Sequence, residues 1–74
     1  METWRELGQA IREIRHEAGL TQEQLAEGAS LHVTYLSEVE NGRKNPSIAV
    51  LRKIAVGLNV RLSALIERAE SHYS

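Results

Sequence analysis

Residues 21–42 read TQEQLAEGASLHVTYLSEVENG. This stretch opens with Thr21, which together with Gln24 matches the pattern of a helix capping box. Leu20 and Leu25 have the spacing of a hydrophobic staple, which fixes the entry of the chain into a helix. The pattern therefore predicts a short helix that starts directly after Thr21.

The same stretch predicts a second helix after a brief turn. The first helix is expected to end at about Ala29, since glycine and serine nearby are poor interior residues. The second is expected to begin near His32 and to end at Asn41-Gly42, with three residues directed inward: Tyr35, Leu36 and Val39. Two short helices joined by a turn of three or four residues have the geometry of a helix-turn-helix, whose second helix enters the DNA major groove.

Three further helices are predicted on either side of this pair. The first begins with a capping box formed by Thr3 and Glu6 and stops at Ala18, because Gly19 can adopt the left-handed conformation. Its apolar residues recur at helical spacing: Trp4, Leu7, Ala10, Ile11 and Ile14.

The C-terminal part contains a loop and the last two helices. Arg43-Lys44-Asn45-Pro46 is read as the loop, and Ser47 as the N-cap of a helix that runs to about Leu58. Asn59 supplies a left-handed turn before a fifth helix, about Leu62 to Ala69. The alternation typical of strands is absent, so the predicted class is all-α, a five-helix bundle.

Length and composition limit the classes of function that the protein can have. A chain of 74 residues is expected to form one domain over 1–74, with a core of about 7–66. It has no cysteine, and its three histidines lack ligand spacing, so neither a disulfide nor a metal site is predicted. There is no membrane span, signal peptide or phosphate-binding glycine loop, so we expect a soluble cytoplasmic protein without enzymatic activity, cofactor, small-molecule ligand or membrane partner.

The charge is divided unevenly along the chain. Residues 1–40 hold eight glutamates against three arginines, a balance of −5, whereas residues 41–66 hold five cations and no acid, a balance of +5. The net charge of the whole chain is −1. Such asymmetry indicates either an anionic partner on one face or two solvated faces of opposite sign.

The sequence resembles the Cro and phage-repressor type of helix-turn-helix family, often called XRE-like. The likeness is carried by Thr21-Gln22, by Glu40-Asn41-Gly42 and by Asn45-Pro46-Ser47 at this spacing, and it extends from about Leu7 to Ile66. It implies a lambda-repressor-like fold and a sequence-specific transcriptional regulator that acts as a homodimer on an inverted-repeat DNA operator. The stand-alone size also resembles the controller proteins of restriction–modification systems, in a bacterium or phage.

The resemblance implies roles for individual residues. Five residues match base-reading positions: His32, Val33, Thr34, Ser37 and Glu38. Five match phosphate-contacting positions: Gln22, Tyr35, Arg43, Lys44 and Asn45. Tyr35 either presents its hydroxyl to a phosphate or only packs in the core. Glu38 departs from the family pattern, in which this position is often basic or an amide. A carboxylate beside phosphates is unfavourable unless it finds a donor.

Two further features of the resemblance concern architecture. Arg15 and Glu40 match a partly buried ion pair that locks the first helix to the third. The fifth helix and tail are expected to form a dimer interface that includes Val56, Leu65, Ile66 and Ala69. The alternatives are a monomer and, for the whole protein, a protein-interaction module such as an antitoxin or a partner of another regulator.

Overall fold

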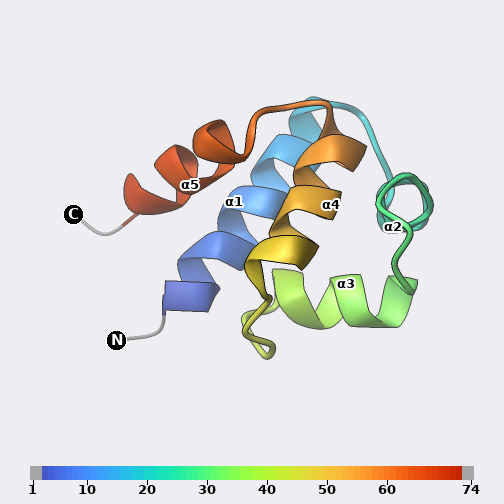
Figure 1. The fold of residues 1–74 in the computed structure, drawn as a ribbon, viewed down its shortest axis with the longest axis horizontal. Helices are drawn as coiled ribbons and strands as arrows, with labels where there is room; N and C mark the ends of the chain where they lie inside the picture. The colour runs from blue at the N-terminus through green and yellow to red at the C-terminus, as the bar shows by residue number, and fades with distance from the viewer. Residues whose placement is uncertain (1–2, 73–74) are drawn as a thin grey trace.

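A computed structural model describes residues 3–72 of the chain (Figure 1). Its helices are α1 (Thr3–Glu17), α2 (Gln22–Gly28), α3 (Val33–Glu40), α4 (Ile48–Leu58) and α5 (Leu62–Glu70). Residues 3–72 contain no strand, and the predicted all-α class is confirmed for this range.

The structure agrees with the sequence prediction at the C-terminal end of α1 but not at its N-terminal end. Thr3 is already helical, so its predicted role as the cap is wrong; the residue before it lies outside the described range. A cap is worth about 1 kcal/mol, and a helix boundary can therefore shift by one residue at little cost. At the other end Gly19 has a φ of +73°, and Leu20 N–H donates to the carbonyl of Arg15 at 3.1 Å. This left-handed turn closes α1 at the expected place.

The helix-turn-helix pair follows at once. The Thr21 hydroxyl accepts from Gln24 N–H at 3.1 Å, and Gln24 Oε1 accepts from Thr21 N–H at 2.9 Å, which confirms the capping box. Ser30 takes a left-handed conformation, with a φ of +57°, in the turn between α2 and α3. His32 caps α3 without a side-chain hydrogen bond.

The last two helices begin and end on local signals. Ser47 Oγ accepts from Val50 N–H at 3.1 Å, and Asn59 adopts the predicted left-handed conformation with a φ of +60°. Within residues 3–72 no helix combines the length and the apolar character needed to cross a membrane.

Packing leaves one side of α3 uncovered. Helix α1 packs against α3 and α5, and α2 packs against α3 and α4. The largest fully buried side chains come from all five helices: Ile11, Leu25, Leu36, Val39, Ile54 and Leu65. Because α3 runs along one edge of the molecule (Figure 1), its inner side joins this core and its outer side faces solvent.

Glycine is required where α1 crosses α3. A Cβ atom on Gly8 would lie 2.6 Å from the carbonyl oxygen of Glu40 and closer still to that of Val39. Both oxygens belong to the backbone, so a side chain at this position would force the two helices apart. The close approach fixes the depth at which α3 sits on α1.

Candidate nucleic-acid interface

A buried ion pair joins α1 to the end of α3. Arg15 Nε donates to Glu40 Oε2 at 2.7 Å, and Arg15 Nη2 donates to Glu40 Oε1 at 3.0 Å. The side chain of Glu40 has no exposed area, and that of Arg15 is 9% exposed. The remaining Nη1 group of Arg15 donates to the carbonyl of Leu20 at 2.9 Å, directly before α2.

Helix α2 is held by the same carboxylate. Gln22, the first residue of α2, donates from Nε2 to Glu40 Oε1 at 3.0 Å. Three helices therefore meet on the carboxylate of Glu40. A network in which each polar atom has a partner fixes orientation, because a buried carboxylate without donors would be costly.

The expected base-reading residues extend along α3 from its N-cap, His32, to Glu38. His32, Val33 and Thr34 are exposed, and Ser37 and Glu38 are half-buried. Leu36 and Val39 occupy the opposite, buried side of the same helix. The side chains of these five residues are thus at least partly accessible to solvent.

The loop after α3 carries the expected phosphate contacts. Arg43, Lys44 and Asn45 are exposed, and the loop is anchored by Arg43 N–H, which donates to the carbonyl of Glu38 at 2.9 Å. Lys44 Nζ lies 4.0 Å from Glu38 Oε1, so the carboxylate on α3 has a cation beside it. Tyr35 is half-buried and packs against the core.

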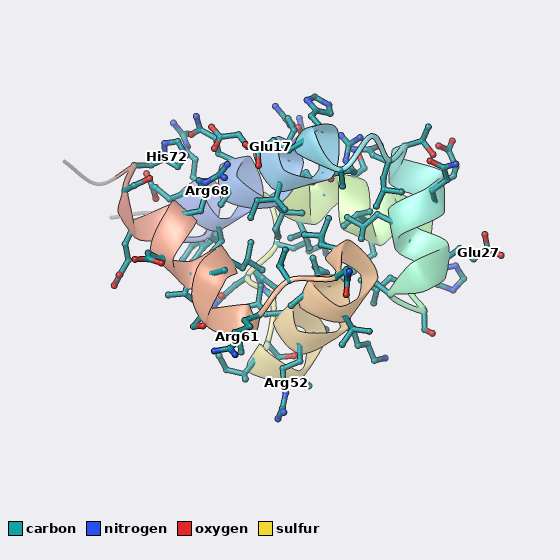
Figure 2. All side chains as sticks on the ribbon, turned by 90° about the horizontal axis from the view of Figure 1, so that it is seen from above. Glu17, Glu27, Arg52, Arg61, Arg68 and His72 are labelled. Carbon is teal, nitrogen blue, oxygen red and sulfur yellow. The ribbon has the colours of Figure 1, made fainter. Side chains whose placement is uncertain are left out.

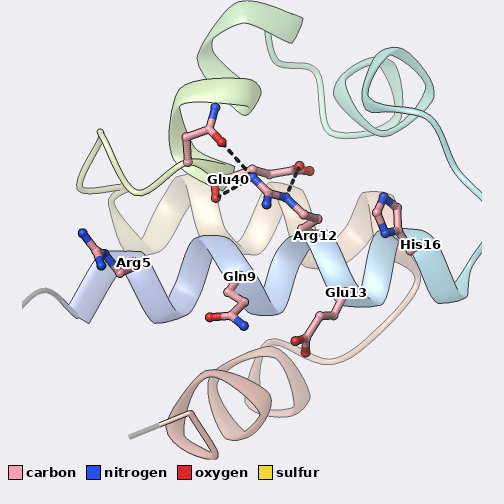
Figure 3. Close-up of a pocket in the computed structure, with 7 residues that line it drawn as sticks. Arg5, Gln9, Arg12, Glu13, His16 and Glu40 are labelled. Atoms are coloured by element: carbon pink, nitrogen blue, oxygen red, sulfur yellow. Dashed lines mark hydrogen bonds and ion pairs between the residues drawn. The ribbon is translucent and has the colours of Figure 1, made fainter.

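Sequence reasoning missed a further contact between α1 and α3. Arg12 Nη2 donates to Asn41 Oδ1 at 2.7 Å and to the carbonyl of Glu40 at 3.4 Å, and Arg12 Nε lies 3.7 Å from Glu40 Oε1. Figure 3 shows this bridge beside a shallow hollow, which is lined by Arg5, Gln9, Arg12, Glu13, His16, Glu40 and Asn41. The two partners are 29 residues apart, and no local pattern signals them.

The expected dimer surface needs correction. Leu65 and Ala69 are buried within the single chain, at 0% and 4% exposure, because α5 packs this side against the core. Neither is available to a second copy. Ile66 is half-buried and lines a hollow with Leu62, whereas Val56, 74% exposed, lines a separate hollow beside α2.

An ionic cluster that sequence reasoning missed joins α5 to α1. Arg68 donates to both oxygens of Glu17, at 2.9 and 3.0 Å, and to Glu13 at 3.3 Å (Figure 2). The hydrogen bond from Arg68 lowers the pKa of Glu17. Desolvation raises the pKa of Glu13, but hydrogen bonds from His72 and Arg68 outweigh it and the net pKa is lowered. Both carboxylates therefore favour the charged form.

No group of three or more potential metal ligands comes together within residues 3–72. His72 pairs with Glu13 at 3.2 Å, and His32 caps α3 on the other side of the chain. The polar residues of the described range are thus arranged to hold helices and to present α3.

Comparison with known proteins agrees with this geometry. Residues 11–65 match the model of a family described as "Helix-turn-helix". The immunity repressor protein of Bacillus phage phi105 is 45% identical over 60 residues, which are 81% of this chain and 42% of that protein. The matched segment therefore covers less than half the length of the phage repressor.

Two proteins match over nearly their whole length. The control protein C.MunI from Mycoplasma sp is 39% identical over 64 residues, 85% of this chain and 86% of that protein. The crystal structure of the clp gene regulator ClgR from C. glutamicum superposes with a TM-score of 0.93 at 30% identity, over 97% of this chain and 94% of the other.

Proposed function

Because the chain belongs to the helix-turn-helix family, we propose that it is a sequence-specific DNA-binding transcriptional regulator. The observation that carries the proposal is the set of hydrogen bonds to the carboxylate of Glu40, which join α1 and α2 to α3. These bonds lie on the inner side of α3, so its outer side stays accessible. A rigid helix with an accessible polar side is what major-groove reading requires. The relatives support this reading, since they include a phage immunity repressor and a control protein.

Phosphate contacts set the position of the protein on DNA. Gln22 lies at the N-terminus of α2, where free N–H groups and the helix dipole favour an anion. Arg43, Lys44 and Asn45 follow the C-terminal end of α3, and the hydrogen bond from Gln22 Nε2 to Glu40 Oε1 at 3.0 Å brings Gln22 to that same end. Contacts of this kind carry the salt-dependent and sequence-independent part of the affinity.

Base reading is assigned to the first turns of α3. Val33 and Thr34 offer methyl groups that suit the methyl of thymine, and Glu38 can accept from the amino group of cytosine. The nearby Lys44 offsets the repulsion between Glu38 and the DNA backbone. His32 and Ser37 complete this surface and can donate or accept hydrogen bonds.

A homodimer completes the proposal. Ile66 and Leu62 form the apolar part of a hollow on the outer side of α5. Two copies related by a two-fold axis through this hollow would bury these apolar side chains against each other. Two reading helices about 34 Å apart would enter successive major grooves and select an inverted repeat. We place such a regulator in the cytoplasm, on the nucleoid of a bacterium or a phage-infected cell.

The experiment is selection of duplexes from a randomised pool by the purified protein, followed by sequencing. Enrichment of an inverted repeat with half-sites about one helical turn apart is the expected result. If no duplex is enriched and none is bound at low salt, the regulator proposal fails. The outer side of α3 would then be tested as a surface for a protein partner.

A further inference from the structure

Within residues 3–72, the end of α3 has one positive charge that no neighbouring carboxylate neutralises. Arg12, Arg15 and Glu40 form a cluster with two cations and one anion. Arg15 is 9% exposed and directs Nε and both amino groups into the protein, so it and Glu40 form the neutral pair. The surplus charge lies on Arg12, whose side chain is 43% exposed.

We propose that Arg12 contacts a phosphate of the DNA backbone; this rests on the proposed function. The guanidinium group is planar, permanently charged and suited to two-pronged contact with phosphate. Its Nη1 group makes no hydrogen bond within residues 3–72 and is available to a ligand.

The side chain of Arg12 is held in place before DNA arrives. Its Nη2 group is fixed by Asn41 Oδ1 at 2.7 Å and by the carbonyl of Glu40 at 3.4 Å. Both acceptors lie at the C-terminal end of α3, where the helix dipole favours a cation. A guanidinium held in this way loses less conformational entropy when it binds a phosphate.

Arg12 lies beside another residue proposed to contact phosphate. Glu40 Oε1 accepts from Gln22 Nε2 at 3.0 Å and lies 3.7 Å from Arg12 Nε, so these two nitrogens are neighbours. Asn41, which holds Arg12, is followed after one residue by Arg43 of the phosphate-binding loop. Arg12 therefore lies at the C-terminal end of α3, close to both groups that are proposed to contact phosphate.

The acidic residues near Arg12 do not oppose this role. Figure 3 shows the side chain of Glu13 on the side of α1 away from α3, whereas Arg12 is directed toward α3. Glu13 is paired with Arg68 at 3.3 Å and with His72 at 3.2 Å. Arg5 and His16 also line the hollow beside Arg12, and the charge of Glu40 there is balanced by Arg15.

The test measures how the affinity for DNA depends on salt. The wild-type protein and Arg12→Gln are titrated with the duplex that the wild type selects, at several salt concentrations. Removal of one phosphate contact should reduce the slope of log K against log salt by about 0.9 for each protomer. The affinity should fall by a similar factor on unrelated duplexes, because a phosphate contact reads no sequence.

Arg52→Gln is the matched control. It removes the same charge from an exposed arginine of α4, and Figure 2 shows Arg52 projecting from the edge of the molecule opposite Glu17 of α1. Its slope should equal that of the wild type. Thermal melting of each variant shows whether the protein remains folded during the titration.

Each outcome bears on the inference. An unchanged slope in a folded Arg12→Gln variant would overturn it and would assign Arg12 to helix packing alone. If that variant unfolds, Arg12→Lys is compared with the wild type on duplexes that carry single methylphosphonates. Neutralising the contacted phosphate should lower the DNA affinity of the wild type more than that of Arg12→Lys. Equal losses of affinity would overturn the inference. A wild type that binds no duplex would overturn the proposed function as well.

Discussion

Loss of Arg15 is expected to remove a large part of the stability of this domain. Arg15→Ala removes two hydrogen bonds to Glu40 and one to the carbonyl of Leu20, and it leaves a carboxylate with no exposed area. Breaking a buried pair in this way costs about 3–5 kcal/mol. Gln22 at 3.0 Å and Arg12 at 3.7 Å remain near the carboxylate, so the lower figure is expected.

This cost is large for so small a protein. Stabilities of about 0.05–0.15 kcal/mol per residue give about 4–11 kcal/mol for the whole chain. A loss of about 3 kcal/mol corresponds to a fall in Tm of about 12–24 °C for a domain of this size. Circular dichroism at 222 nm during heating measures it, with Arg52→Ala as a surface control that should change stability by less than about 0.5 kcal/mol.

A double variant separates the charge effect from a packing effect. Arg15→Met with Glu40→Leu replaces both partners by apolar residues of similar size, which is often neutral for a buried pair. It should recover most of the lost Tm. If Arg15→Ala melts like the wild type, the reasoning that places this ion pair at the centre of the fold is refuted.

Three further outcomes are expected elsewhere in the molecule. Gly8→Ala should cost about 2–3 kcal/mol, because its new Cβ would overlap backbone oxygens of α3, and urea denaturation with an unchanged midpoint would contradict this. Ile66→Glu should leave the helix content intact and convert a dimer into a monomer in sedimentation; a persistent dimer would remove the α5 interface. The lowered pKa values of Glu13 and Glu17 stabilise the fold at pH values above 4.5, their ordinary pKa, and this contribution should disappear as the pH falls through the lower folded pKa values. Arg68→Ala should therefore lose less Tm than the wild type when the pH is lowered below 4.5. An equal loss of Tm in both proteins would exclude the cluster as its source.

Features encoded within a few residues could be predicted from the sequence. The cap at Thr21, the N-cap at Ser47 and the left-handed turn at Asn59 depend on adjacent backbone groups, and the structure has all three. Helical periodicity likewise identified Leu36 and Val39 as buried. Local chemistry decides such features, so the rest of the chain need not be known.

Features decided by docking between distant helices could not be predicted in this way. Ala69 was expected to lie in the dimer interface, but the packing of α5 against α1 buries it. Arg68 and Glu17 are 51 residues apart, and each alone resembles an ordinary surface charge. Arg12 was missed for the same reason, because its partner Asn41 had been read only as the end of a helix.

Base reading by the outer side of α3 is the property on which the proposed function most depends. The most direct measurement is selection from one randomised pool, in parallel, with the wild type, Thr34→Ala and Glu38→Gln. Each substitution should change the preferred base at one position in each half-site and leave the spacing of the half-sites unchanged. Identical preferences for all three proteins, each shown to be folded, would contradict the claim that α3 reads the operator.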